Sequence, residues 1–211
     1  RFFLQLKKNI LDSIIKSNPK KIILIDYPGF NLSLAKSIKE ITNIPIVYYI
    51  SPQVWAWKKK RVYSIKKYID KLIVVFPFEI DWFKKYNLNV SFFGHPLIDQ
   101  FQSLKNTKAQ KKTKTIALFP GSRSQEIKKH LPLLNKTVKI LTEKNPDLKF
   151  VLNITSSFLI DKIQSKVNPN IKVVQKKSSD IFLNSCAAIV TSGTATLECA
   201  ITKTPFVVIY K

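Results

Sequence analysis

One turn of this sequence combines small residues with a group that can bind phosphate. Residues 118–123 read LFPGSR, so an apolar run gives way to Pro120, Gly121 and Ser122 before Arg123. A turn from a strand into a helix directs backbone N–H groups and the positive end of the helix dipole toward a ligand. The guanidinium of Arg123 can hold a phosphate through two hydrogen bonds. An ordinary turn with a solvated Arg fits the same residues equally well.

A second turn of this kind lies at residues 191–198, TSGTATLE. Small residues at Ser192 and Gly193 let the backbone approach a phosphate, and Ser192 or Thr194 can cap the following helix and bind an oxygen. Glu198 falls about one turn into that helix, where its carboxylate can accept two hydrogen bonds from a ribose diol. A capping box, in which Glu198 bonds back to the helix start, is the alternative, and the residues alone do not separate the two.

Two further single residues could take part in chemistry. Asp26 ends the apolar run IILID and is followed by Tyr27, Pro28 and Gly29. Its carboxylate can act as a general base or orient a hydroxyl, although a turn-forming Asp is the simpler interpretation of that residue alone. His95, in the segment FGHP, is a candidate of the same kind, but a lone His is more often structural.

The segment 51–61, SPQVWAWKKKR, begins at Ser51 and places Trp55 and Trp57 beside four cations that end at Arg61. Indole rings at the level of lipid headgroups with cations toward the phosphates suit a membrane interface. The same residues could hold a phosphorylated sugar. Two core Trp residues and a solvated helix start are the third interpretation.

The elements that must position these groups alternate regularly. Continuous Ile, Val and Leu runs separated by helical patterns predict an α/β fold with parallel sheets covered on both faces. The predicted strands are residues 21–26, 44–50, 71–76, 90–93, 115–119, 149–154, 171–174, 187–191 and 206–210. The predicted helices are residues 1–18, 31–41, 58–69, 79–86, 126–144, 157–166, 179–184 and 194–203.

The polar, Lys-rich segment 103–114, SLKNTKAQKKTK, shows no periodicity and predicts an interdomain linker, with a long surface loop as the alternative. It divides the chain into a first Rossmann-like domain, 1–102, and a second, 115–211. Two such sheets place a ligand cleft between the domains, at the carboxyl ends of the strands.

The composition bounds the function classes. The chain has 211 residues, 45% of them hydrophobic, and no apolar run reaches the roughly 18–20 residues of a membrane span. Its two cysteines suit neither a disulfide framework nor a metal site, which favours a reducing compartment. The chain begins with Arg1 and contains no Met, so we interpret it as an internal piece of a longer protein.

The formal net charge of +23 is compatible with an anionic membrane surface, a nucleic acid or phosphorylated substrates, and compositional bias explains part of it. Lys is spread along many predicted helices rather than gathered, and no nucleic-acid motif is present. We therefore expect no nucleic acid partner. Only three of the 36 basic residues are Arg, so an Arg at the PGSR turn looks selected.

Taken together, the motifs resemble one family, the lipid-A-disaccharide synthases, over nearly the whole chain. SPQVWAW with its basic run is the most specific of them, whereas PGSR and SGTATLE are shared more loosely with related enzymes. The motifs that carry the resemblance are IDYPGFN (25–31), YISPQVWAWKKKRV (49–62), FPFE (76–79), FFGHPLID (92–99), LFPGSR (118–123) and SGTATLEC (192–199).

The resemblance implies a GT-B-type fold, two Rossmann-like parallel-sheet domains facing across a cleft, both incomplete here. It implies an inverting glycosyltransferase of lipid A (lipopolysaccharide) biosynthesis, peripheral on the cytoplasmic side of the inner membrane of a Gram-negative-type bacterium. A diacylglucosamine would pass from its UDP donor to 2,3-diacylglucosamine 1-phosphate (lipid X), releasing UDP, with no metal and no cofactor. Another UDP-GlcNAc-using GT-B enzyme, a peptidoglycan glycosyltransferase or a UDP-GlcNAc 2-epimerase, is the alternative.

The resemblance also assigns residues. Asp26 and Arg123 would be catalytic, as base and as the group that stabilises the leaving UDP. Residues expected to bind UDP are Gly121, Ser122, Arg123, Ser192, Gly193, Thr194 and Glu198. Residues expected on the acceptor or membrane side are Ser51, Trp55, Trp57, Arg61 and His95.

Three departures from the family pattern stand out. Gly29 replaces the acidic residue of the usual PDFN turn, and the GExSGD loop expected before Arg1 is absent. The helices expected after residue 211, which in the family return to the first domain and contribute to a homodimer, are absent as well. We therefore expect uncovered apolar faces near both ends, and the piece itself to be inactive on its own.

Overall fold

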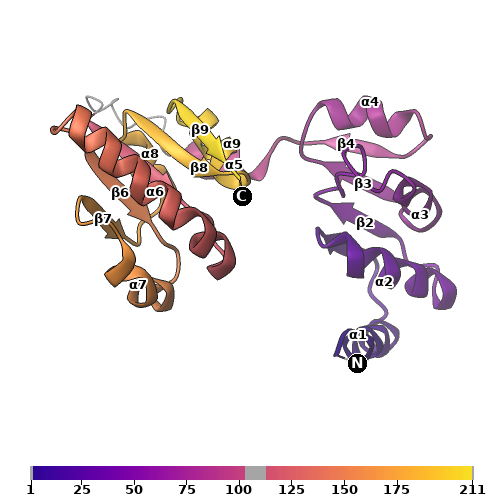
Figure 1. Ribbon diagram of the computed structural model, residues 1–211. Coiled ribbons are helices and arrows are strands. Elements are labelled where there is room, and N and C mark those ends of the chain that lie inside the picture. The colour runs from indigo at the N-terminus through magenta and orange to yellow at the C-terminus, as the bar shows by residue number, and fades with distance from the viewer. Residues whose placement is uncertain (1, 103–112, 211) are drawn as a thin grey trace. The chain divides into compact units, whose positions relative to one another are not determined.

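The computed structural model describes residues 2–102 and 113–210, and its helices and strands alternate along the chain (Figure 1). The chain divides into two compact units, Arg1–Pro96 and Leu97–Lys211, each of which is described by itself. All but the last two residues of the predicted linker 103–114 lie outside the described residues.

The first unit is a parallel sheet with the order β1-β2-β3-β4. Its core combines alternate strand residues with one face of each helix, and Ile38, Tyr48 and Phe83 are fully buried in it. The strands are β1 (Ile22–Ile25), β2 (Ile46–Tyr49), β3 (Lys71–Val74) and β4 (Val90–Phe92), and the helices are α1 (Phe2–Ser17), α2 (Pro28–Ile41), α3 (Arg61–Tyr68) and α4 (Phe78–Lys84).

The second unit is a parallel sheet with the order β7-β6-β5-β8-β9. Leu118 of β5 faces the core formed with α6, whereas its neighbour Ala117 faces the core formed with α8 and α9, so helices cover both faces. The elements are α5 (Pro96–Gln102), β5 (Thr115–Phe119), α6 (Ser124–Lys144), β6 (Lys149–Asn153), α7 (Ser157–Ile163), a 3₁₀ turn (Gln164–Lys166), β7 (Ile171–Val174), α8 (Ser178–Leu183), β8 (Ala187–Thr191), α9 (Thr194–Ile201) and β9 (Phe206–Ile209).

Every predicted strand is present, with ends displaced by no more than two residues, and the α/β class is confirmed. The predicted start of helix 58–69 is wrong, because Lys58 has a φ of +52°, which a right-handed helix cannot contain, and α3 starts at Arg61. Helix α5 was not predicted; it begins at Pro96, and proline is favoured at the first position of a helix.

Coverage of the sheets is incomplete near both ends, as expected. Ile23 and Ile25 of β1 are exposed, and so are Val207 and Val208 of β9. Both strands lie at an edge of their sheet. Within the described residues, no helix is both long enough and apolar enough to cross a bilayer.

Candidate functional site

The second unit contains a pocket of about 530 Å³ at the carboxyl ends of β5 and β8. The chain runs from β5 outward to β7 and then returns to β8 on the other side of β5, so these two strands flank the point where the strand order reverses. Open α/β sheets bind ligands at that point. The pocket is lined by Phe119, Gly121, Ser122, Arg123, Glu126, Asn153, Thr155, Lys176, Lys177, Ser178, Thr191, Ser192, Gly193, Thr194, Ala195 and Glu198.

All seven residues predicted to bind UDP line this one pocket. They come from two turns that are about 70 residues apart in the sequence, and parallel pairing of β5 with β8 brings the turns to the same edge of the sheet. Phe119 pairs with Val190 in that register. The sequence pattern therefore located two halves of a single cavity.

The N–H groups of the PGSR turn, which were expected to face a ligand, already have a partner within the chain. Oε2 of Glu126 accepts hydrogen bonds from the backbone N–H groups of Ser122 (3.1 Å) and Arg123 (3.2 Å). Oε1 of Glu126 forms an ion pair of 2.6 Å with Nη1 of Arg123. The turn thus carries a carboxylate of its own.

The ionisation of Glu126 follows from these contacts. The hydrogen bond from the Arg123 guanidinium holds the pKa of Glu126 below its usual range, aided by the two backbone N–H groups and opposed by partial burial. Glu126 is therefore anionic at neutral pH.

Sequence reasoning missed His130, a buried residue of α6 that joins the two turns. Its Nδ1 lies 2.8 Å from the carbonyl oxygen of Pro120 and 3.3 Å from Oγ1 of Thr191, while Thr191 donates to the carbonyl of Phe119 (3.1 Å). Donation to Pro120 requires the proton on Nδ1. His130 interrupts the apolar face of its helix, and that interruption was the available signal.

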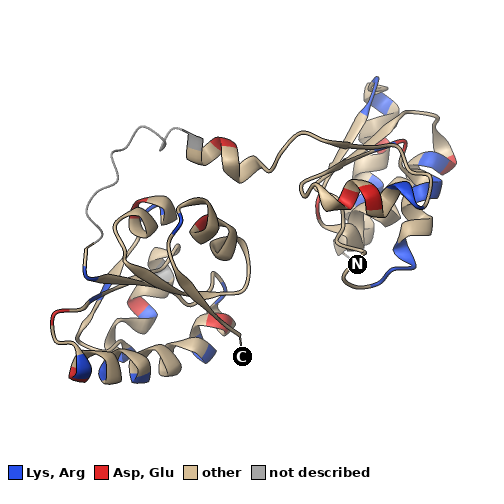
Figure 2. Ribbon diagram, turned by 90° about the horizontal axis from the view of Figure 1, so that it is seen from above, with Lys and Arg blue, Asp and Glu red and all other residues tan. Residues whose placement is uncertain are grey.

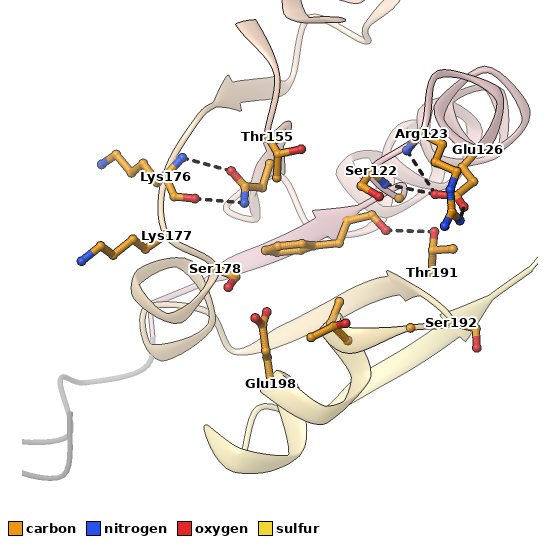
Figure 3. Close-up of a pocket in the computed structure, with 16 residues that line it drawn as sticks. Ser122, Arg123, Glu126, Thr155, Lys176, Lys177, Ser178, Thr191, Ser192 and Glu198 are labelled. Carbon is orange, nitrogen blue, oxygen red and sulfur yellow. Dashed lines mark hydrogen bonds and ion pairs between the residues drawn. The ribbon is translucent and has the colours of Figure 1, made fainter. Parts of the chain in front are cut away.

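Glu198 extends from α9 into the pocket on the side where Ser178 lies (Figure 3). The capping-box alternative is not observed: the third residue of α9 is Thr196, whose hydroxyl donates to the carbonyl of Gly193 (2.7 Å). Within the described residues, no hydrogen bond or ion pair occupies the Glu198 carboxylate. The carboxylate is therefore available to a ligand.

The end of the pocket opposite Arg123 is formed by the segment after β7, which the sequence did not single out. Asn153 fixes this segment, because its side-chain amide accepts from the N–H of Lys176 (3.1 Å) and donates to the carbonyl of Lys176 (3.2 Å). The side chains of Lys176 and Lys177 extend outward from the pocket (Figure 3). The guanidinium of Arg123 and the PGSR turn lie at the other end of the pocket.

The cysteines take no part in this arrangement. Both are free, and burial raises the pKa of the Cys199 thiol to about 12, with a smaller contribution from the neighbouring Glu198. Cys199 is therefore not a thiolate nucleophile at neutral pH. Among the described residues, no group of three His, Cys, Asp or Glu side chains could hold a metal ion.

The first unit holds a buried carboxylate that sequence reasoning did not single out. Glu79 of α4 is 0% exposed and accepts hydrogen bonds from Ser51 Oγ (3.1 Å), Trp55 Nε1 (3.0 Å) and the N–H groups of Val75 (3.2 Å) and Phe76 (3.0 Å). Ser51 and Trp55 therefore direct their polar atoms inward. Through Glu79 they fix the loop after β2 to the turn after β3.

Replacing Glu79 with Gln is expected to lower the free energy of unfolding by about 1–2 kcal/mol, because an amide can accept on one oxygen only and leaves buried donors unpaired. Urea denaturation measures this change. Asp81→Asn, an exposed position of the same helix, is the matched control and should stay within about 0.5 kcal/mol of wild type. Equal stability of the Glu79 variant and wild type would show that the four hydrogen bonds contribute nothing.

Of the remaining acceptor-side candidates, Trp57 is exposed, whereas Arg61 and His95 are half-buried. Trp57 is 58% exposed, with Nζ of Lys58 4.6 Å and the guanidinium carbon of Arg61 5.6 Å from its ring centroid. The ring of His95 lies 5.5 Å from that of Phe76. Trp57 and Arg61 thus form an aromatic and cationic group in which Trp57 is exposed and Arg61 is half-buried.

Asp26 lies at the carboxyl end of β1 in a left-handed conformation, with a φ of +46°. Its backbone is held on three sides: its N–H donates to the carbonyl of Tyr49 (3.1 Å), and its carbonyl accepts from Tyr48 Oη (2.5 Å) and Asn31 Nδ2 (2.7 Å). Its side chain is exposed, and within the described residues no hydrogen bond or ion pair involves the carboxylate. The backbone is fixed while the carboxylate stays accessible.

Comparison with known proteins adds independent findings. The chain matches the family described as lipid-A-disaccharide synthetase over residues 1–211. It is 41% identical to lipid-A-disaccharide synthase 1 of Legionella pneumophila (strain Paris), covering 97% of this chain and 56% of that protein. It is 40% identical to the lipid-A-disaccharide synthase of Coxiella burnetii (strain Dugway 5J108-111), covering 93% and 54%. The chain thus spans a little over half the length of these relatives.

Solved structures resemble both sheets. A co-structure of Staphylococcus aureus MnaA with UDP has a TM-score of 0.71 at 14% identity, covering 100% of this chain and 63% of that one. The UDP-GlcNAc 2-epimerase of Neisseria meningitidis bound to UDP-GlcNAc has a TM-score of 0.70 at 14% identity, covering 99% and 64%. At this identity the likeness shows the fold, which is of the GT-B type.

Proposed function

The chain belongs to the lipid-A-disaccharide synthase family, and from this premise we propose that the protein containing it is an inverting glycosyltransferase of lipid A biosynthesis. It transfers 2,3-diacylglucosamine from the UDP-linked donor to 2,3-diacylglucosamine 1-phosphate (lipid X). The products are the lipid A disaccharide 1-phosphate and UDP.

The observation that carries the proposal is the pocket at the reversal point of the second sheet. Its lining combines a guanidinium, two turns with small residues and an unoccupied carboxylate. In our assignment the diphosphate binds Arg123 and the backbone of the turns at 121–123 and 192–194, and the ribose hydroxyls donate to Glu198.

The chemistry requires a base and a group that stabilises the leaving group. The 6-hydroxyl oxygen of the acceptor attacks C1 of the donor sugar from the face opposite UDP, the bond from C1 to the phosphate oxygen breaks, and the configuration inverts. We assign the hydroxyl proton to Asp26 and the growing charge on the β-phosphate to Arg123.

For the acceptor and membrane side we propose the group formed by the exposed Trp57 and the half-buried Arg61. We add His95, which directly precedes the last residue of the first unit. Ser51 and Trp55 contribute by fixing the same loop through Glu79. Lys and Arg are distributed over helices and loops of both units (Figure 2), and the net charge of +23 favours the anionic cytoplasmic face of an inner membrane. A homodimer of the full-length protein belongs to the same proposal.

The test is a transfer assay with the full-length protein. UDP-2,3-diacylglucosamine and lipid X should give the disaccharide 1-phosphate and one UDP per product, identified by mass spectrometry. Turnover of UDP-GlcNAc to its 2-epimer, or transfer of unacylated GlcNAc, with no reaction of the acylated pair, would establish the alternative of another UDP-GlcNAc-using enzyme instead.

Glu198→Ala is expected to weaken UDP binding by roughly 10- to 100-fold, because two hydrogen bonds to a charged acceptor are lost. Calorimetry with UDP and 2′-deoxy-UDP separates this role from a general disturbance. Wild type should prefer UDP over the deoxy form, and the variant should lose that preference. GMP is the control for base selectivity. A variant that keeps its preference for UDP would remove Glu198 from the ribose site.

A further inference from the structure

The place assigned to a donor phosphate already contains an anion that belongs to the chain. A phosphate at the PGSR turn would use the N–H groups of Ser122 and Arg123 and the guanidinium of Arg123. Those three donors are the ones that bind Glu126, at 3.1, 3.2 and 2.6 Å. A ligand and the Glu126 carboxylate cannot both take the two backbone N–H groups and Nη1 of Arg123, although the other N–H groups of the guanidinium are not bound to Glu126.

The hollow of the turn is filled by the same side chain. Gly121 has a φ of +109°, and a Cβ built on it would lie 2.4 Å from Oε2 and 2.8 Å from Cβ of Glu126. A glycine that would let a phosphate approach the backbone is therefore covered by the Glu126 carboxylate. Figure 3 shows Glu126 directed toward Ser122 and Arg123 at this end of the pocket.

These contacts exceed those of a helix cap. In a capping box the third helical residue bonds back to the N–H of the cap residue alone, which here is Arg123. Glu126 also takes the preceding N–H, of Ser122, and the guanidinium. The Glu126 side chain is 27% exposed and the Arg123 side chain 80% exposed, so the two can move apart without unpacking the core.

We propose that the Glu126 carboxylate occupies the phosphate position of the PGSR turn in the free protein, where it accepts hydrogen bonds from the turn. A phosphate of the nucleotide displaces the carboxylate when the UDP-linked substrate binds. This inference rests on the proposed function, since it takes the pocket as the UDP site. In the exchange Nη1 of Arg123 and the two backbone N–H groups pass from the carboxylate to the phosphate, and Glu126 turns toward solvent.

Two consequences follow from the exchange. The turn stays formed without ligand, because its donors are never unpaired. Phosphate binding is weakened, because each phosphate must displace an internal competitor of the same charge sign. A ligand that fills only the nucleoside part of the pocket displaces nothing, so Glu126 sets affinity for the phosphate part selectively.

The test compares Glu126→Gln with wild type in the full-length protein, by calorimetric titration with UDP and with uridine. Gln keeps the size and one oxygen acceptor for the helix cap but removes the charge. We expect UDP to bind about three- to tenfold more tightly to the variant, because binding no longer has to break the accessible ion pair between Arg123 and Glu126. Uridine should bind equally to both proteins. Glu143→Gln, an exposed change of the same kind near the other end of α6, should alter neither affinity.

Weaker UDP binding by Glu126→Gln would overturn the proposal, because it would mean that Glu126 holds Arg123 in place for the phosphate. Unchanged UDP binding, or an equal gain for uridine, would overturn it as well. If wild type binds neither UDP nor uridine, the proposed function fails, and inorganic pyrophosphate then tests the exchange by itself. Tighter pyrophosphate binding by Glu126→Gln would support the exchange, and equal binding would contradict it.

Discussion

Asp26→Asn is expected to lower the rate of glycosyl transfer by about 10²- to 10⁴-fold, the usual contribution of a general base, without changing UDP affinity. An amide cannot accept the proton of the acceptor hydroxyl. Asn tolerates the left-handed conformation of this residue, and the bonds from Tyr48 and Asn31 reach the backbone of Asp26 rather than its carboxylate. The loss therefore reports the carboxylate itself and not a change in the turn.

The measurement is kcat of the full-length enzyme together with UDP binding by calorimetry. Asp12→Asn, an exposed change in α1 of the same unit, is the matched control and should retain wild-type turnover. Loss of UDP binding in Asp26→Asn would place Asp26 on the donor side. A decrease in rate of less than about threefold would remove it from the reaction.

Arg123→Lys is expected to reduce kcat/KM by roughly 30- to 150-fold, equivalent to about 2–3 kcal/mol of transition-state stabilisation. Lys keeps the charge but cannot reproduce the planar pair of hydrogen bonds to a phosphate. Since Arg123 also binds Glu126 through one side-chain contact of 2.6 Å, the variant retains an ion pair and the turn can stay formed.

The effect of Arg123→Lys should depend on the phosphate. Uridine affinity, which involves no phosphate, is the internal control and should equal that of wild type. Wild-type kcat/KM in the variant would contradict the assignment of Arg123 to the leaving group, and a parallel loss of uridine binding would indicate that the pocket itself had changed.

The strands and the two turns of the pocket in the second unit were predictable because the interactions that form them are local. Apolar runs such as 115–119 and 187–191 are long enough for one strand, and Gly121 and Gly193 end them where the backbone takes a positive φ. The carboxyl-end rule for parallel sheets then gives the site. Family resemblance added the order of the motifs and the role that we propose for Asp26.

The missed features depend on contacts that sequence spacing does not determine. Glu126 was expected only to begin a helix. The two backbone hydrogen bonds that its carboxylate accepts depend on the path of the turn over Gly121. His130 and Glu79 are buried polar residues whose partners lie on other elements. Neither residue shows any signal in sequence beyond a polar group at a core position.

The most direct test of the account is a crystal structure of the full-length protein with UDP. We predict the ribose hydroxyls within hydrogen-bond distance of Glu198 and the diphosphate between the turn at 120–123 and the turn at 192–194. We also predict Arg123 bound to phosphate and Glu126 released from Ser122. UDP bound elsewhere, or a diphosphate remote from both turns, would contradict the assignment of this pocket as the donor site.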